Sequence, residues 1–179
     1  MAEIIKIYRQ SVPAMRFIGK KYEDKDRVNG GFAKQWEEWF SNGWFEVLEK
    51  SYNPKSAYED GDAYVGLMRW KEEEPFEYWI GMFCPNNAEV PEGYSFIDFD
   101  ESDLGVVWLY GKEHEVYGQE HKCADRCLKE GYKIIPDRQG AYWFFERYVC
   151  PRFTTPDAKG NIILDICHFI EKTANEEML

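Results

Sequence analysis

The chain has 179 residues, which is enough for one domain or for two small related halves. Its content of 44% hydrophobic and 31% charged residues is typical of a globular protein. The net charge of −11 excludes the basic surface that phosphate binding requires, so no nucleic-acid partner is expected. A negative field of this size attracts cationic small molecules instead.

The start of the chain and its cysteines bear on the compartment. Residues 1–9 lack the charged and then apolar pattern of a secretory leader, and no apolar run approaches the roughly 20 residues of a membrane span. Five cysteines, an odd number, favour reduced thiols. We therefore expect a cytoplasmic monomer that does not contact a membrane.

The first half of the chain is predicted to form a strand, a helix and a hairpin of two strands. Residues 1–8 alternate only loosely, whereas Phe32, Trp36 and Phe40 recur at helical spacing up to a stop signal at Asn42-Gly43. We expect a strand over residues 12–20, a charged loop over 21–30, a polar loop over 51–62 and the two hairpin strands over 63–70 and 76–83.

The second half repeats this order. Cys123 and Cys127 belong to the apolar stripe of a helix that Gly131 ends. We expect two strands over residues 94–99 and 105–111, the helix over 118–130 and a third strand over 141–148. A turn over 154–160 and a last strand over 162–170 follow.

The order strand–helix–strand–strand thus occurs twice, in pseudo-repeats of about 3–88 and 89–171 within a single domain of residues 1–179. This order predicts an α+β fold of two small antiparallel sheets, each with a helix on one face. If the sheets face one another, their faces without helices enclose a central cleft.

The stretch 141–148 carries the strongest candidate for chemistry. Alternation along a strand places Glu146 on one face with three aromatic residues, and Trp143, Phe145 and Arg147 on the other. A carboxylate in an aromatic wall is costly to bury unless a cation or a hydrogen-bond donor meets it. That partner is a ligand, Arg147 or solvent.

The predicted ligand wall consists of aromatic residues and one methionine from four strands. Its members are Tyr142, Phe144, Tyr148, Trp108, Tyr110, Tyr64, Met68, Trp70 and Trp79 or Tyr78. Four other aromatic residues are predicted to fill the core between helices and sheet: Trp36, Phe40, Trp143 and Phe145.

Metal and cofactor chemistry is not expected. His121 is two residues from Cys123 on a helix, so the two side chains diverge, and Cys123 and Cys127 suit a buried stripe better than zinc. His114 and His168 stand alone and are predicted to be structural. The sequence holds no nucleophile elbow, phosphate loop or dinucleotide fingerprint.

Six short segments, spread over residues 3–171, together resemble the GyrI-like small-molecule-binding family, which also provides the effector domain of AraC- and MerR-type multidrug regulators. They are Phe17-Ile18-Gly19, the helix with Trp36, Trp39 and Phe40, Ala63-Tyr-Val-Gly66, Pro91-Glu-Gly-Tyr94, Trp108-Leu-Tyr-Gly111 and Trp143-Phe-Phe-Glu-Arg-Tyr148.

The resemblance implies a duplicated fold with a ligand groove between the halves and a carboxylate at its centre. The family's carboxylate position falls on Glu146, and in the multidrug regulators this residue receives cationic lipophilic compounds. No helix-turn-helix precedes the domain here, so an output other than direct promoter binding is expected. The stretch from Trp143 to Phe153 is similar to that of stand-alone members, some of which resemble hydrolases of cyclopropane-bearing genotoxic compounds.

Three functions follow as hypotheses. The first is binding of a hydrophobic, cationic or electrophilic small molecule around Glu146, for sensing or sequestration. The second is hydrolysis of a cyclopropane-bearing compound, with Glu146 as general base and Tyr110 or Tyr148 as proton donor. The third is a gyrase-inhibitor-like interaction through the acidic runs 72–74 and 98–103 with a basic protein.

Overall fold

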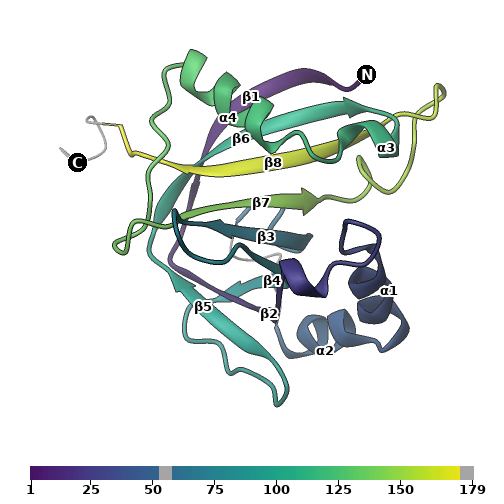
Figure 1. Ribbon diagram of the computed structural model, residues 1–179, viewed down its shortest axis with the longest axis vertical. Helices are drawn as coiled ribbons and strands as arrows, with labels where there is room; N and C mark the ends of the chain where they lie inside the picture. Colours follow the sequence, from purple (N-terminus) through teal and green to yellow (C-terminus); the bar gives the residue numbers. More distant parts are fainter. Residues whose placement is uncertain (53–57, 174–179) are drawn as a thin grey trace.

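The computed structural model describes residues 1–52 and 58–173 and shows an α+β fold built on one antiparallel sheet of eight strands (Figure 1). The strand order is β1-β6-β8-β7-β3-β4-β2-β5. The strands are β1 (Glu3–Val12), β2 (Met15–Glu23), β3 (Tyr64–Trp70), β4 (Glu77–Pro85), β5 (Ser95–Phe99), β6 (Ser102–Gly111), β7 (Tyr142–Tyr148) and β8 (Ile162–Ile170). The helices are η1 (Asp24–Asp26), α1 (Ala33–Ser41), α2 (Trp44–Ser51), α3 (Glu113–Val116) and α4 (Glu120–Lys129).

The expectation of two separate sheets is wrong, because β3 and β7 pair with each other along their whole length. The register runs from Tyr64 opposite Tyr148 to Trp70 opposite Tyr142. This central pair joins two groups of three strands, β6-β8-β7 and β3-β4-β2. Each group contains the predicted order of a strand, helices and two further strands.

The sheet curls, and its topology requires this. β1 and β2 are first and seventh in the sheet, about 29 Å apart if the sheet were flat. Only Pro13 and Ala14 link them, and such a link spans about 10 Å. Figure 1 shows β1 passing across the sheet to reach β2. Inside the curl, one face of the sheet packs a core that includes Phe17, Phe145 and Phe169.

The opposite face carries the α-helices of the described residues, over two separate cores. One core, beneath α1 and α2, contains Trp39, Phe45 and Ile80. The other, beneath α3 and α4, contains Val107 and Cys123. The β7–β3 pair lies between these two cores, so the helices lie over the two ends of the sheet and not over its middle (Figure 1).

Most predicted elements are confirmed, with two differences. The segment 3–12 is a full strand. Its sequence indicates a strand only weakly, because β1 lies at the edge of the described sheet, paired with β6, and most of its side chains are partly or fully exposed. The helix predicted over 118–130 is present as α4, but the short helix α3 before it was not predicted, and Gly118, with a φ of +73°, lies between the two. The predicted loop 51–62 and the polar tail lie partly outside the described residues.

Two observations concern the membrane and the thiols. Among the described helices, none is long and apolar enough to cross a membrane. All five cysteines are free, and Cys150 is the exposed one.

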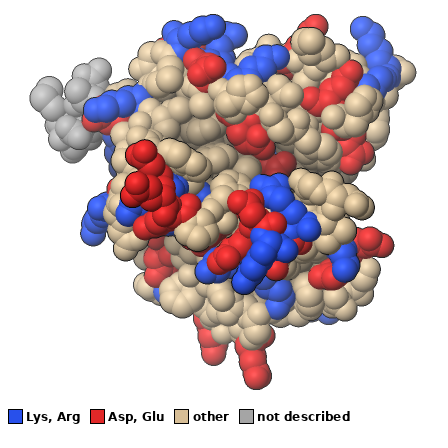
Figure 2. All heavy atoms as spheres, viewed as in Figure 1, with Lys and Arg blue, Asp and Glu red and all other residues tan. Residues whose placement is uncertain are grey.

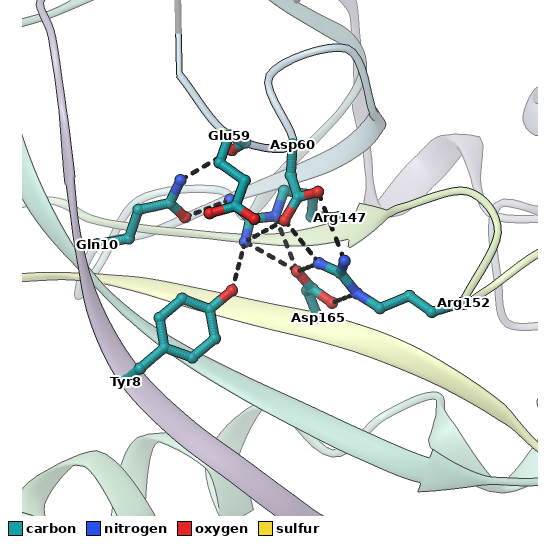
Figure 3. A network of polar contacts seen from close by, with 7 residues as sticks. All are labelled: Tyr8, Gln10, Glu59, Asp60, Arg147, Arg152 and Asp165. Atoms are coloured by element: carbon teal, nitrogen blue, oxygen red, sulfur yellow. Dashed lines mark hydrogen bonds and ion pairs between the residues drawn. The ribbon is translucent and has the colours of Figure 1, made fainter.

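A network of charged side chains lies on the curled face, directly behind the middle of the sheet (Figure 3). Arg147 and Asp165 are both almost completely buried, and the Arg147 Nε donates to Asp165 Oδ2 at 2.9 Å. Arg152 donates to the same carboxylate and also to Asp60. Arg147 also donates to Gln10. The network therefore ties β7 to β8, to β1 and to the loops on either side.

Removing the charge of Asp165 is expected to destabilise the fold strongly. In Asp165→Asn, two arginines lose the carboxylate that they share, and breaking a buried ion pair on one side costs about 3–5 kcal/mol. Urea denaturation measures this loss. The matched control is Asp100→Asn, which removes an exposed pair with Arg138 and should change little. Equal urea midpoints for the two variants would contradict the assignment.

Candidate functional site

A cavity of about 1150 Å³ opens over the middle of the sheet, on the helix-bearing face. Its floor is formed by β3 and β7, and its walls come from α1 on one side and from the α3–α4 segment on the other. Aromatic residues dominate the lining and include Phe32, Trp36, Phe40, Tyr64, Trp70, Phe76, Tyr78, Tyr117, Tyr142, Phe144, Tyr148 and Phe153. The cavity is thus large enough for a ligand of several rings.

Glu146 lies in the floor of this cavity and is 6% exposed. The Tyr78 hydroxyl donates to its Oε1 and the Tyr148 hydroxyl to its Oε2, each at 2.8 Å. Trp36 Nε1 donates in turn to the Tyr78 hydroxyl at 2.9 Å. Among the described residues, these two tyrosines are the hydrogen-bond partners of the carboxylate, and it forms no ion pair.

Arg147, one of the three partners that the sequence left open, is excluded. Successive residues of a strand point to opposite faces, so Arg147 points into the curled face and pairs with Asp165. Glu146 is therefore separated from the nearest arginine along the chain by the sheet itself.

Aromatic packing fixes the two tyrosines that hold Glu146. The Phe32 and Tyr78 rings stack with centroids 4.2 Å apart and an interplanar angle of 1°. Tyr148 is contacted edge-on by Trp36 at 4.9 Å and by Phe153 at 4.7 Å. The carboxylate thus lies in a rigid frame of rings whose hydroxyls point at it.

Burial raises the pKa of Glu146 to about 7, and the nearby charge of Glu120 acts in the same direction. The hydrogen bonds from Tyr148 and Tyr78 oppose this rise. Burial and the charge of Glu146 hold the pKa values of both tyrosine hydroxyls well above their usual range, so both remain protonated donors. Near neutral pH, Glu146 can accordingly exist in either form.

Gly66 makes room for this arrangement. It lies opposite Glu146 in the β3–β7 pair, and a Cβ at this position would be 2.5 Å from the Tyr78 hydroxyl oxygen and 2.9 Å from Glu146 Oε1. Both distances are too short for any side chain. The sequence shows a glycine inside a predicted strand, which indicates close approach of neighbouring groups, but not which groups approach.

Seven of the predicted site residues are brought together around the cavity. They are Glu146, Tyr142, Phe144, Tyr148, Tyr64, Met68 and Trp70. Of the two alternatives on β4, the structure places Tyr78 in the site and Trp79 on the other face, because Tyr78 is the residue opposite Met68.

Trp108 and Tyr110 were also predicted to line the site, and the structure places them elsewhere. Trp108 is opposite Asp165, which is opposite Arg147, so it belongs to the curled face. Its ring lies beneath the Arg152 guanidinium at 4.5 Å. Tyr110 has the same phase on β6, and its hydroxyl donates to Asp157. Pairing registers, which decide these faces, are not readable from one strand alone.

The predicted position of the cleft, on faces without helices, is wrong, since the cavity is on the helix-bearing face. Trp36 and Phe40 were assigned to the core for the same reason, but they line the cavity, and Phe40 is 60% exposed. Trp143 and Phe145 are core residues as predicted, although they pack inside the curl and not beneath the helices.

The sequence did not predict the cavity wall that α3, the start of α4 and the residues between them form. This wall contributes Glu113, Tyr117, Glu120 and His121. A polar helix start gives no sign that its side chains face a cavity. Arg27 at the rim is the one Lys or Arg among the described lining residues, and it is paired with Asp24 at 2.8 Å.

Replacing Gly66 by alanine is expected to break the Tyr78–Glu146 hydrogen bond, because the new methyl group overlaps both oxygens. Loss of that bond removes an interaction that lowers the pKa of Glu146, so the pKa should rise above about 7. Carbon-13 NMR titration of the Glu146 carboxyl measures the shift. Gly31→Ala is the control, since a Cβ there meets nothing within 4 Å. An unchanged pKa in Gly66→Ala would contradict this account.

Comparison with known proteins identifies the fold. No family model and no curated protein matches the chain. Among solved structures, SAV2435 bound to tetraphenylphosphonium is similar with a TM-score of 0.63 and 17% identity, over 97% of each chain.

Two further structures each have a TM-score of 0.58 over 94% of this chain. One is a putative bacterial transcription regulation protein from Staphylococcus aureus, 15% identical over 99% of its own length. The other is EcmrR in a complex with DNA, 13% identical and matched over 58% of its length. The chain therefore shares the fold of these three structures, a GyrI-like fold, in agreement with the family that its sequence resembles.

Proposed function

We propose that this protein binds hydrophobic organic cations in the cavity, with Glu146 as the anionic anchor, and so senses or sequesters them. The observation that carries the proposal is a buried carboxylate, without a basic partner among the described residues, in the floor of an aromatic cavity.

Desolvation makes the ionised form of Glu146 costly in the empty cavity, which is why its pKa is raised. A lipophilic cation removes this cost because its own desolvation is cheap and its charge meets the carboxylate at short range. The surrounding ring faces add about 0.5–2 kcal/mol each through cation–π contacts. Met68, a deformable side chain in the floor, suits ligands of varied shape.

The fold comparison supports this reading. SAV2435, which has the same fold, was solved with tetraphenylphosphonium, a hydrophobic cation. The duplicated architecture and the ligand groove that the resemblance implies are consistent with the symmetrical strand order and with a cavity over the central β7–β3 pair.

The structure gives less support to an interaction with a basic protein. The acidic runs are largely neutralised within the chain, as Glu74 pairs with Arg69, Asp98 with Arg16 and Asp103 with Arg9. Figure 2 shows acidic and basic side chains interspersed over one face of the molecule. A single-signed surface for a basic partner is not visible on that face.

Affinity for tetraphenylphosphonium is expected to depend on pH. The cation binds the deprotonated carboxylate, so affinity should be constant well above pH 7 and fall about tenfold per pH unit below the pKa of about 7. Intrinsic tryptophan fluorescence, with Trp36 in the cavity wall, reports binding.

Two variants sharpen this measurement. Glu146→Gln should bind weakly and without pH dependence. In Glu120→Gln, loss of a charge that raises the pKa of Glu146 should move the midpoint of the pH curve to lower pH. If Glu146→Gln kept wild-type affinity at pH 8, the anchor role would be wrong.

Hydrolysis is the second candidate function, favoured by one observation. A carboxyl group with a pKa of about 7 is suited to act as general base near neutral pH. The proposed donors fit less well: Tyr110 is not in the cavity lining, and the Tyr148 hydroxyl already donates to Glu146. Binding without turnover therefore agrees better with the geometry.

Turnover can be tested directly by incubating the protein with a cyclopropane-bearing genotoxic compound and analysing the recovered compound by mass spectrometry. We expect the compound to be returned unchanged, because the tyrosine hydroxyls at Glu146 are engaged with it. A water adduct that forms with the wild type and not with Glu146→Gln would establish a hydrolase instead.

A further inference from the structure

His168 is a polar exception in an apolar setting. On β8 it shares a face with Leu164, Ile166 and Ile170, which are all buried in the sheet's helix-bearing side. It is 5% exposed and it also lines the cavity. Its ring stacks on Phe144, the residue opposite it on β7, with centroids 5.4 Å apart and an interplanar angle of 12°.

The ring nitrogens of His168 have no hydrogen-bond partner in the part of the chain that the structure describes. Its Nδ1 is buried without a hydrogen bond, and within the described residues neither ring nitrogen has a recorded one. Buried polar atoms in proteins are nearly always hydrogen-bonded, and exceptions commonly mark functional groups. Burial also lowers the pKa of His168 to about 4, so the ring is neutral at physiological pH and does not repel a bound cation.

We propose that His168 is a second polar contact for the ligand, which hydrogen-bonds a hydroxyl group on an aromatic cation held by Glu146. This inference rests on the proposed function and specifies its substrate class further. A neutral imidazole has one N–H and one lone pair, so it can accept from a hydroxyl or donate to it. The cavity thereby selects for hydroxylated aromatic cations over purely hydrocarbon ones.

The register fixes the spacing that such a ligand must match. Phe144 is opposite His168, and Glu146 is opposite Ile166, so His168 and Glu146 are diagonal neighbours on the same face. Diagonal neighbours on paired strands are about 7–8 Å apart. The hydroxyl group must therefore lie about one aromatic ring away from the cationic centre.

The test compares tetraphenylphosphonium with its three monohydroxylated forms, which carry one hydroxyl at the ortho, meta or para position of one ring. At least one isomer should bind the wild type about tenfold more tightly than tetraphenylphosphonium, the effect of one good hydrogen bond in a buried site. In His168→Phe, which keeps a ring to stack on Phe144, this gain should vanish, so that the isomer and tetraphenylphosphonium bind the variant with equal affinity.

The outcomes separate this inference from the proposed function. If tetraphenylphosphonium and all three isomers bind equally well to the wild type, or if the gain persists in His168→Phe, the role of His168 is wrong and cation binding stands. If none of the four compounds binds, both proposals fall together.

A second measurement does not depend on the folding of the variant. Nitrogen-15 spectra of the histidine rings of the wild type should show His168 shifting with the tight-binding hydroxylated isomer and much less with tetraphenylphosphonium. His114, which is outside the cavity lining, serves as the internal reference. Equal His168 shifts with both compounds would overturn the assignment.

Discussion

Two oppositely charged neighbours on β7 point to opposite faces of the sheet, and the rest of the structure depends on this separation. Arg147 enters the curled face and is neutralised there by Asp165. Glu146 enters the cavity, where only tyrosine hydroxyls meet it among the described residues. An arginine one position away along the chain cannot cross the sheet to it. The cavity therefore retains a carboxylate without a basic partner among the described residues, and the proposed function assigns that partner to the ligand.

The buried network also positions the site that it backs. Arg147 and Arg152 share Asp165, and Arg152 is followed by Phe153, whose ring packs against Tyr148. The loop after β7 is thus fixed on one face by ion pairs and on the other by an aromatic contact. The orientation of a tyrosine that donates to Glu146 depends on charges on the far side of the sheet.

Local sequence patterns predicted much of the fold and the centre of the site. The run of strand-forming residues in β7 and the helical spacing in α1 indicated which residues share a face, and Glu146 was found because a carboxylate among aromatic residues is chemically unusual. What could not be predicted depends on long-range pairing. Trp108 and Tyr110 alternate along their strand as the aromatic residues of β7 do, but the face on which they lie is set by the β6–β8 register.

The single continuous sheet was missed for a related reason. Nothing local in β3 or β7 specifies that each is the other's neighbour, and their pairing decides on which side of the sheet the cavity forms. A lone histidine in an apolar strand carries no pattern, so the sequence predicts only a structural role for His168. The proposed role of His168 depends on the pairing of β8 with β7, which places the cavity beside this residue.

The separation of the two cores beneath the helices has a consequence for how this protein can diversify. The cavity floor is made by paired strands in which Gly66, Glu146 and Tyr78 constrain one another atom by atom, so substitution there is tightly limited. The walls belong to helices that pack on separate cores at the two ends of the sheet. Under the proposed function, changes in one wall can therefore reshape the cavity for new compounds while the floor that carries Glu146 is inherited intact, which separates the evolution of ligand shape from that of ligand charge.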